Sequence, residues 1–167
     1  MVCAHSVARM KKCTTTVAAR VANIDDKSSP LPDEGNARGR VLDPVRRRWV
    51  TLTPEEAVRQ RIIATLHEDY GYPLELMQVE GTISVNGLTR RCDIVVYDTA
   101  GRPHIIVECK RPDVAITQRV CDQACRYNTA LHVPLLVLTN GVQQVVVEVD
   151  FDRRALRQLD DLPKYST

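Results

Sequence analysis

Three charged side chains interrupt two runs of residues that otherwise have the composition of buried β-strands. Asp93 starts the run 93–97, and Glu108 and Lys110 end the run 105–110. Alternate residues of a strand face the same way, so Glu108 and Lys110 share one face. Charges on an apolar strand are expensive unless they are paired, bind a metal or serve a function. An acid opposite an acid-x-lysine suits metal-dependent phosphodiester cleavage, because carboxylates hold a hard cation and lysine offsets charge at the phosphate.

The composition indicates one domain with a sizeable core and an extension. The chain has 167 residues, of which 44% are hydrophobic and 26% charged. It contains no uncharged apolar run of about 18 residues, so we expect no membrane span. The beginning of the chain lacks the pattern of a secretion signal, and Cys92 and Cys109 alternate with their neighbours as small hydrophobes do. These features favour a reduced, cytoplasmic protein.

Charge is distributed unevenly along the chain. Residues 1–48 carry ten Lys or Arg against five Asp or Glu, a balance of +5, whereas residues 49–167 carry thirteen against sixteen, a balance of −3. A slightly negative domain must contact a polyanion through a local patch or through the basic extension. The triplet at 46–48 is one such candidate, and a solvated surface explains it equally well. The other candidates are Arg90-Arg91 and Lys110-Arg111.

The chain divides at about residue 40. Residues 1–40 contain breakers and acids with no apolar period, which predicts a basic, disordered extension, and residues 41–167 form the expected domain. Thr53 and Glu56 have the spacing of a helix N-cap and capping box, and Pro54 suits the first turn. Apolar residues then repeat at helical spacing up to Asp69. We therefore expect a helix from residue 54 to 69.

A sheet and a second helix follow. Asn86-Gly87 is a strong hairpin signal between apolar runs. The predicted order is helix, three strands, helix and two strands, a mixed α/β fold with a central sheet. After the first helix, the expected strands are 82–85, 91–97 and 104–109, the second helix is 117–131, and the last strands are 134–139 and 142–149.

Asp93, Glu108-x-Lys110 and Gln123-x-x-x-Tyr127 occur in this order, and together they resemble the PD-(D/E)XK nuclease superfamily. Gln123 and Tyr127 lie four residues apart, on one face of the second helix. The wider sequence resembles the N-terminal nuclease domain of the type I restriction enzyme R subunit, in its short stand-alone form. The segments that carry this likeness are 52–56, 58–60, 90–93, 106–112, 122–128 and 138–141. The resemblance implies an α/β fold with a PD-(D/E)XK restriction-endonuclease-like core, a central mixed β-sheet flanked by helices.

The resemblance also implies roles for single residues. Asp93 and Glu108 would ligate Mg²⁺, or Mn²⁺ in its place, with the carbonyl of Cys109 as a further ligand. Lys110 would position the nucleophilic water, and Gln123 would orient DNA or the lysine at the rim of the site. The residues expected to contact DNA are Arg59, Arg91, Arg111 and Tyr127.

The superfamily often adds a glutamate from the first helix to the site. Glu55 lies on the helical face of Val58 and Ile62, which must meet the sheet, whereas Glu56 already has a capping role. We expect Glu55 to be the catalytic residue, and a glutamate in a first turn also stabilises the helix dipole.

Other interpretations remain open at this stage. The chain could be a DNA-binding module without catalysis, or a subunit active only beside a helicase or methyltransferase, and it could form a homodimer. Glu108 and Lys110 could be an exposed cross-strand pair, and Tyr127 could belong to the core. Cys121 and Cys125 lack a second pair with ligand spacing, so we expect no zinc site.

Overall fold

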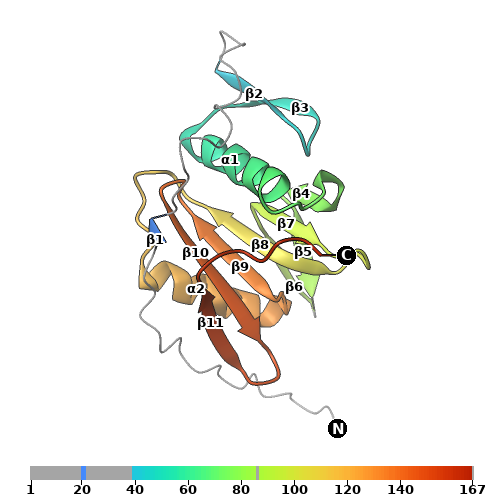
Figure 1. The fold of residues 1–167 in the computed structure, drawn as a ribbon, viewed down its shortest axis with the longest axis vertical. Coiled ribbons are helices and arrows are strands. Elements are labelled where there is room, and N and C mark those ends of the chain that lie inside the picture. Colours follow the sequence, from blue (N-terminus) through green and yellow to red (C-terminus); the bar gives the residue numbers. More distant parts are fainter. Residues whose placement is uncertain (1–19, 22–38, 86, 167) are drawn as a thin grey trace.

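The computed structural model describes residues 20–21, 39–85 and 87–166, in which two α-helices cover a seven-stranded mixed sheet (Figure 1). The strand order is β1-β10-β9-β8-β7-β4, and β11 also pairs with β10. Only the pair β8–β9 is parallel among these neighbours, and the others are antiparallel. The strands are β1 (Arg20–Val21), β4 (Met77–Val79), β7 (Ile94–Tyr97), β8 (Pro103–Cys109), β9 (Leu135–Thr139), β10 (Gln143–Asp150) and β11 (Ala155–Leu159).

The two helices begin within one residue of their predicted starts. Helix α1 is Pro54–Glu68, and Thr53 Oγ1 accepts a hydrogen bond of 3.1 Å from the backbone N–H of Glu56. Helix α2 is Gln118–Leu131, with Thr117 as its N-cap. A short 3₁₀ helix, Leu74–Leu76, follows α1. The start of α1 was predictable because its cap acts within three residues of sequence.

The sheet is buried on both faces. On one face, Ile63 and Leu66 of α1 pack with a cluster that includes Ile105 and Val107 of β8. On the other face, α2 packs with a cluster that includes Ile106. Alternate residues of β8 therefore enter different cores, as expected of a strand between two helical layers. The residues that α2 contributes to its cluster are Cys121, Ala124, Cys125 and Leu131, with Val120 packed against it.

Two separate ribbons accompany the central sheet. One is the hairpin of β2 (Arg40–Asp43) and β3 (Arg48–Thr51), and the other is the hairpin of β5 (Thr82–Val85) and β6 (Leu88–Arg91). The predicted strand 91–97 is thus wrong as a single element: it breaks at Cys92 and Asp93, where β6 ends and β7 begins. The break is fixed by Cys92 N–H, which donates to the Gly81 carbonyl, and by Glu80 N–H, which donates to the Asp93 carbonyl.

The coarse prediction of a mixed α/β fold with a central mixed sheet is confirmed, but five strands rather than three lie between the helices. The prediction missed β1, β2, β3, β4 and β11, and of β6 it included only Arg91. The hairpin around Asn86-Gly87 is present, since Val85 pairs with Leu88 and Gly87 has a φ of 78°. Of the predicted extension, Arg20 and Val21 pair with β10, residues 39 and 40 enter the first hairpin, and the remainder lies outside the described residues. Within the described part of the chain, no helix has the length and apolarity needed to cross a membrane.

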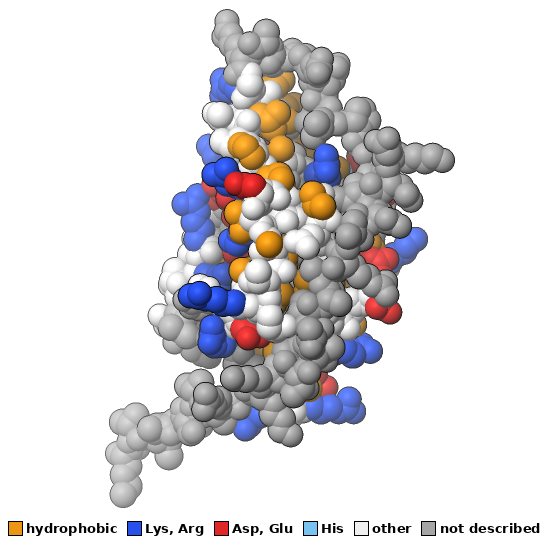
Figure 2. Space-filling view, turned by 90° about the vertical axis from the view of Figure 1, so that its left-hand side faces the viewer, with side chains coloured by type: hydrophobic (Ala, Val, Ile, Leu, Met, Phe, Trp, Pro, Cys, Tyr) orange, Lys and Arg blue, Asp and Glu red, His pale blue; other side chains and the backbone are white. Residues whose placement is uncertain are grey.

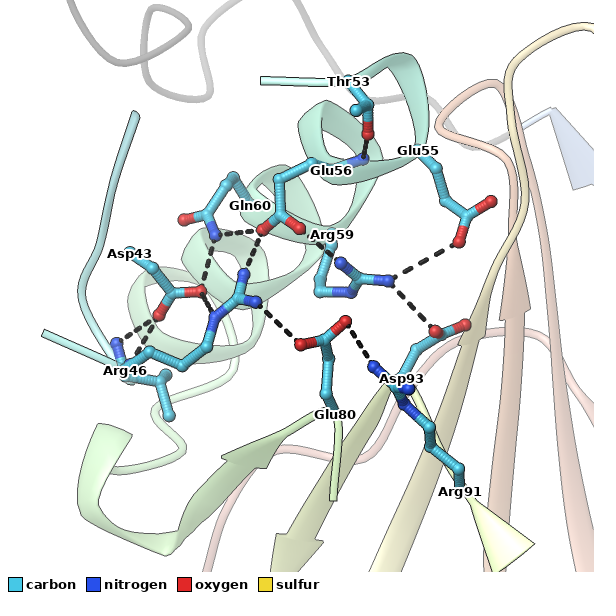
Figure 3. A network of polar contacts seen from close by, with 11 residues as sticks. Asp43, Arg46, Thr53, Glu55, Glu56, Arg59, Gln60, Glu80, Arg91 and Asp93 are labelled. Atoms are coloured by element: carbon cyan, nitrogen blue, oxygen red, sulfur yellow. Dashed lines mark hydrogen bonds and ion pairs between the residues drawn. The ribbon is translucent and has the colours of Figure 1, made fainter. Parts of the chain in front are cut away.

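The β2–β3 hairpin is fastened to α1 by ionic contacts (Figure 3). The Asp43 side chain is fully buried, and its carboxylate accepts hydrogen bonds from the backbone N–H and the Nε of Arg46. Gln60 Nε2 of α1 donates to Asp43 Oδ2 at 2.9 Å, and the Arg46 guanidinium reaches Glu56 and Glu80. Burial alone would raise the pKa of Asp43, but these donors hold it below its ordinary value. Asp43, Arg46, Glu56 and Gln60 therefore form an ionic anchor that holds the hairpin against α1.

The turn between β9 and β10 approaches α1 closely at Gly141. Its φ is +83°, and a Cβ built there would lie 3.1 Å from Val58 Cγ2. Gly101, in the β7–β8 turn, has a φ of +75° and open space around it.

Replacing Gly101 with Ala should cost about 1 kcal/mol through backbone strain alone. Gly141→Ala should cost about 1 kcal/mol more because Val58 must also move. Urea denaturation measures the loss of unfolding free energy in each variant. Equal losses would contradict the close contact between Gly141 and Val58.

The buried carboxylate of Asp43 in the anchor should make the free energy of unfolding depend on pH. Because the pKa of Asp43 is lowered in the folded chain, its contribution is present above the ordinary value of 3.8 and is lost as the pH falls through the lower folded value. Asp43→Asn should lower the free energy of unfolding at pH 7 by about 2 kcal/mol and flatten its acid dependence. Denaturant titrations between pH 7 and 3 measure this.

Asp98→Asn is the matched control, because Asp98 accepts from the backbone N–H and the Nε of Arg102 in a similar turn but is partly exposed. Water can replace its contacts, so the loss should be smaller. If Asp98→Asn lowers the free energy of unfolding as much as Asp43→Asn does, burial of the Asp43 carboxylate contributes nothing to stability.

Candidate active site

Asp93 and Glu108 lie opposite each other where β7 and β8 meet. The pairing of Ile94 with Val107 places residue 93 beside residue 108 in the antiparallel register. The carboxylate of Asp93 is held at both oxygens: Oδ1 accepts from Arg59 Nη2 at 3.0 Å, and Oδ2 accepts from the Cys109 N–H at 2.8 Å. The two acids and the Cys109 backbone are therefore gathered at one point of the sheet, as the sequence predicts.

Glu108 is the most buried of the predicted acids, with 9% of its surface exposed. Burial raises its pKa; Arg90 opposes this shift, the negative charge of Asp93 adds to it, and Lys110 opposes it. Arg90 Nη2 donates to Glu108 Oε1 at 2.7 Å. The net upward direction shows that the positive charge around Glu108 does not fully compensate for its burial and for Asp93.

Lys110 follows the last residue of β8. Its backbone N–H donates to the Thr139 carbonyl at 2.8 Å, which continues the parallel pairing of β8 with β9 by one residue. The residue is partly buried, and its ammonium makes no ion pair with any carboxylate of the described residues. Its charge nevertheless acts on Glu108. Lys110 thus supplies a positive charge close enough to act on Glu108.

Arg59 connects α1 to Asp93 (Figure 3). Its Nη2 lies 3.0 Å from Asp93 Oδ1 and 3.5 Å from Glu55 Oε1, while Nη1 donates to Glu56. Burial lowers the pKa of Arg59, but the carboxylates of Glu56 and Asp93 outweigh this and raise it. The guanidinium is therefore a permanent positive charge in the site.

The two glutamates at the start of α1 have different surroundings. The Glu55 side chain is 44% exposed and shares Arg59 Nη2 with Asp93. Glu56 is buried and accepts from Arg46, Arg59 and Gln60. Glu55 is thus the glutamate whose carboxylate lies on the Asp93 side of Arg59, whereas Glu56 holds the hairpin anchor and Arg59 together.

The remaining predicted residues lie in several places. Arg91 and Arg111 are exposed, and they pair with Glu80 and Asp113 respectively. Arg59, expected to contact DNA, is buried among three carboxylates. Gln123 is exposed on α2 and is placed in no contact with Asp93, Glu108 or Lys110. The side chain of Tyr127 lies outside the described part of the chain.

Sequence reasoning missed the partners of the acids. It noted Arg90 only as half of a basic pair, and it did not single out Glu80 or Asp43. The signal that points to Arg90 is the buried acid itself, since a carboxylate on a β-strand needs a donor from a neighbouring element. Arg59 and Asp93 are 34 residues apart in the sequence, a separation at which no local pattern reveals a contact.

The donor set suits a hard divalent cation in part. Asp93 and Glu108 supply carboxylate oxygens, the donors that Mg²⁺ prefers, and Mg²⁺ commonly binds through one or two carboxylates while keeping several waters. The raised pKa of Glu108 indicates that further positive charge would be favourable there. Among the described residues, no group of three or more His, Cys, Asp or Glu side chains gathers as a ready metal cage. The residues therefore fit a cation held by two acids rather than by a closed protein cage.

The cysteines of the described residues form no such cage either. Cys92, Cys109, Cys121 and Cys125 are buried and are not joined in disulfides, whereas Cys3 and Cys13 lie outside the described residues. Burial raises the pKa of the Cys92 thiol to about 11, so this thiol stays protonated and serves as a small hydrophobe.

Comparison with known proteins places this site in a family. The search of curated proteins gave no match. Among solved structures, a fragment assigned as an HsdR subunit of a type I restriction enzyme from Vibrio vulnificus YJ016 is 17% identical with a TM-score of 0.46; the alignment covers 66% of this chain and 23% of that chain. The family of the type I restriction enzyme R protein N terminus matches residues 54–163, which include α1, both acids and Lys110. Because this match spans more than half of the chain, the protein belongs to the family of type I restriction enzyme R protein N-terminal domains.

Proposed function

We propose that the chain is a Mg²⁺-dependent DNA endonuclease domain that hydrolyses phosphodiester bonds in restriction, phage defence or DNA repair. The observation that carries this proposal is the placement of Asp93 near Glu108 where β7 and β8 meet, with Lys110 directly after the end of β8. Family membership supports it, because the family is part of a restriction enzyme. Mn²⁺ is the alternative cation, since it accepts the same oxygen donors.

In this proposal Asp93 and Glu108 hold the cation, with the carbonyl of Cys109 as a further ligand. When bound, Mg²⁺ supplies Lewis acidity and neutralises charge on the phosphate. Arg59 and the Cys109 N–H fix the orientation of Asp93, and Arg90 fixes that of Glu108. Preorganised donors of this kind lower the cost of reaching the transition state because they need no rearrangement during the reaction.

Lys110 has the central electrostatic role in the proposal. In the proposal its ammonium orients the attacking water and stabilises the negative charge that builds on the phosphoryl oxygens. Glu55 is the first-helix acid that joins the site, because its carboxylate lies on the Asp93 side of Arg59.

Contacts with DNA complete the proposal. Arg91 and Arg111 offer exposed guanidinium groups to phosphates, and Gln123 and Tyr127 of α2 are assigned to the rim of the site. Arg59 contributes its charge from within the site, where three carboxylates hold it. Salt-dependent binding is expected of contacts with phosphates.

A second candidate function is a subunit that cleaves only beside a helicase or methyltransferase. Family membership favours it, since the family is the N-terminal part of the R protein of a multi-component enzyme. In that case the acids would bind the cation but turnover would need the partner. A homodimer and a cytoplasmic location are further parts of the proposal.

Metal binding tests the acid pair directly. Calorimetric titration with Mg²⁺ or Mn²⁺ should show binding to the wild type, and Asp93→Asn and Glu108→Gln should each remove most of it because each deletes an anionic ligand. The cation should also raise the melting temperature, since it binds the folded state. Asp98→Asn, at the opposite end of β7, is the control and should bind normally. Equal binding by wild type and Asp93→Asn would exclude this metal site.

Lys110 tests the chemistry. Its charge matters most in the transition state, so Lys110→Ala should lower the rate of metal-dependent DNA cleavage by about 10²-fold or more with little change in folding or DNA affinity. Lys110→Arg should not restore full activity, because a planar guanidinium does not replace a compact ammonium. The assay uses single-stranded, duplex and branched DNA with Mg²⁺ and Mn²⁺. Wild-type protein that cleaves no better than Lys110→Ala would favour the partner-dependent function or a binding module.

A further inference from the structure

The outer face of the β2–β3 hairpin presents an apolar pair to solvent. Leu42 and Trp49 are cross-strand partners, and they are 51% and 48% exposed. Successive residues of a strand face opposite ways, so Val41, which is 3% exposed, points inward toward the body of the protein. Figure 2 shows hydrophobic side chains at the surface of the upper part of the molecule, the end at which Figure 1 places the hairpin. An exposed indole in this position has no packing role to account for it.

The charge around this apolar pair is of one sign. Arg40, Arg47 and Arg48 are exposed, whereas Asp43, the only acid among residues 39–53, is fully buried. Arg40 donates to the Trp49 carbonyl at 2.9 Å, which places its guanidinium beside the indole-bearing strand. Arg47 and Arg48 make no ion pair with a described carboxylate. The sequence triplet at 46–48 therefore divides into one anchoring arginine and two that face solvent.

The inner side of the hairpin borders the candidate active site. A cavity of about 670 Å³ is lined by Val50 and Thr51 of β3, by Glu55 and Arg59 of α1, and by Arg46 and Arg111. The ionic anchor described above, from Asp43 through Arg46 and Glu56 to Arg59, joins the hairpin to Asp93. A ligand held on the hairpin therefore lies at a fixed position relative to the acids.

An exposed indole on a hairpin that also exposes arginines matches the chemistry of a single nucleic acid strand. Unstacked bases can stack on an indole, and guanidinium groups neutralise the phosphates between them. Bases of a duplex are already stacked on each other and offer only phosphates to such a surface. The hairpin also precedes residue 54, at which the family match begins, so the surface is not part of what that match accounts for.

We propose that the outer face of the β2–β3 hairpin binds single-stranded DNA, with Trp49 stacking on a base, and with Arg40 on the same face and Arg47 in the turn contacting phosphates. The proposal rests on the proposed nuclease function only in taking DNA as the substrate: it identifies an unpaired strand as the part of the substrate that is held beside the cleavage site. Binding at this surface needs neither the cation nor turnover.

Trp49 is the only tryptophan of the chain, so its fluorescence reports on this surface alone. The full-length protein is titrated with an oligothymidine of about 20 nucleotides in EDTA. Stacking should quench the emission, and a duplex of the same length should quench it much less. With a labelled oligonucleotide, Trp49→Ala should weaken binding about tenfold, and Trp49→Phe should keep much of the affinity because the ring still stacks.

Arg47 has a matched control in the β10–β11 turn. Arg47 and Arg154 are both exposed arginines in hairpin turns, with φ values of 52° and 51°. The two turns lie at opposite ends of the molecule (Figure 1). Arg47→Ala should weaken binding and lower the slope of log affinity against log salt by about 0.7. Arg154→Ala should leave the quenching titration unchanged. Circular dichroism confirms that each variant is folded.

Three outcomes would overturn the proposal. The oligonucleotide could bind without changing Trp49 emission, or Arg47→Ala and Arg154→Ala could weaken binding equally, and either result would place the strand elsewhere. Emission that changes with protein concentration instead of DNA, together with dimers in sedimentation, would assign the face to a second copy of the chain. Quenching without cleavage by the wild type in Mg²⁺ or Mn²⁺ would refute the stand-alone nuclease and leave the hairpin surface standing, and cleavage without quenching would do the reverse.

Discussion

The burial of Glu108 next to a second acid, Asp93, is the constraint on which the rest of the site depends. Antiparallel pairing of β7 with β8 brings the two acids near each other where the sheet is largely buried. Burial raises the pKa of Glu108, and the negative charge of Asp93 adds to this shift. Each acid therefore needs an arginine from another element, Arg59 from α1 and Arg90 from β6. The positions of both elements follow from that need.

Because the pKa of Glu108 is raised, additional positive charge near the two acids would be favourable. Removing one member of a buried ion pair is strongly unfavourable because the other is left uncompensated, whereas a complete pair adds little net stability. The ion pairs of Arg59 with Asp93 and of Arg90 with Glu108 therefore fix the orientation of the two acids rather than add much stability to the fold. Asp93 is the clearer case, since its two oxygens are engaged from opposite directions, by a side chain of α1 and by the backbone of β8. A cation ligand fixed in this way pays little entropy on binding.

Local chemistry explains which parts of the fold were predictable. Thr53 and Thr117 cap their helices through donors three residues away, and Gly87 supplies the positive φ of a two-residue turn, so a short window of sequence contains the whole signal. The strands that were missed are short or lie at edges, where pairing with a partner decides the conformation. The break at Cys92 depends on the Gly81 carbonyl, which no window of that strand contains. The same holds for the site: the spacing of Asp93 and Glu108 predicts their meeting, but their arginine partners come from tertiary structure.

The hairpin illustrates how an anchor on one face frees the other for binding. An isolated two-stranded ribbon is marginally stable in water, so β2–β3 needs support from the body of the protein. That support comes from inward residues, Val41 in the core and Asp43 with its donors from Arg46 and Gln60. Contacts on the inner side hold the hairpin in place. Leu42 and Trp49 on the outer side therefore need not be buried for the hairpin to fold. The same carboxylate, Glu56, receives Arg46 from the hairpin and Arg59 from the site, so any displacement of the hairpin must disturb the arginine that orients Asp93. The geometry of the acids and the position of the exposed surface are consequently set by one connected group of charges.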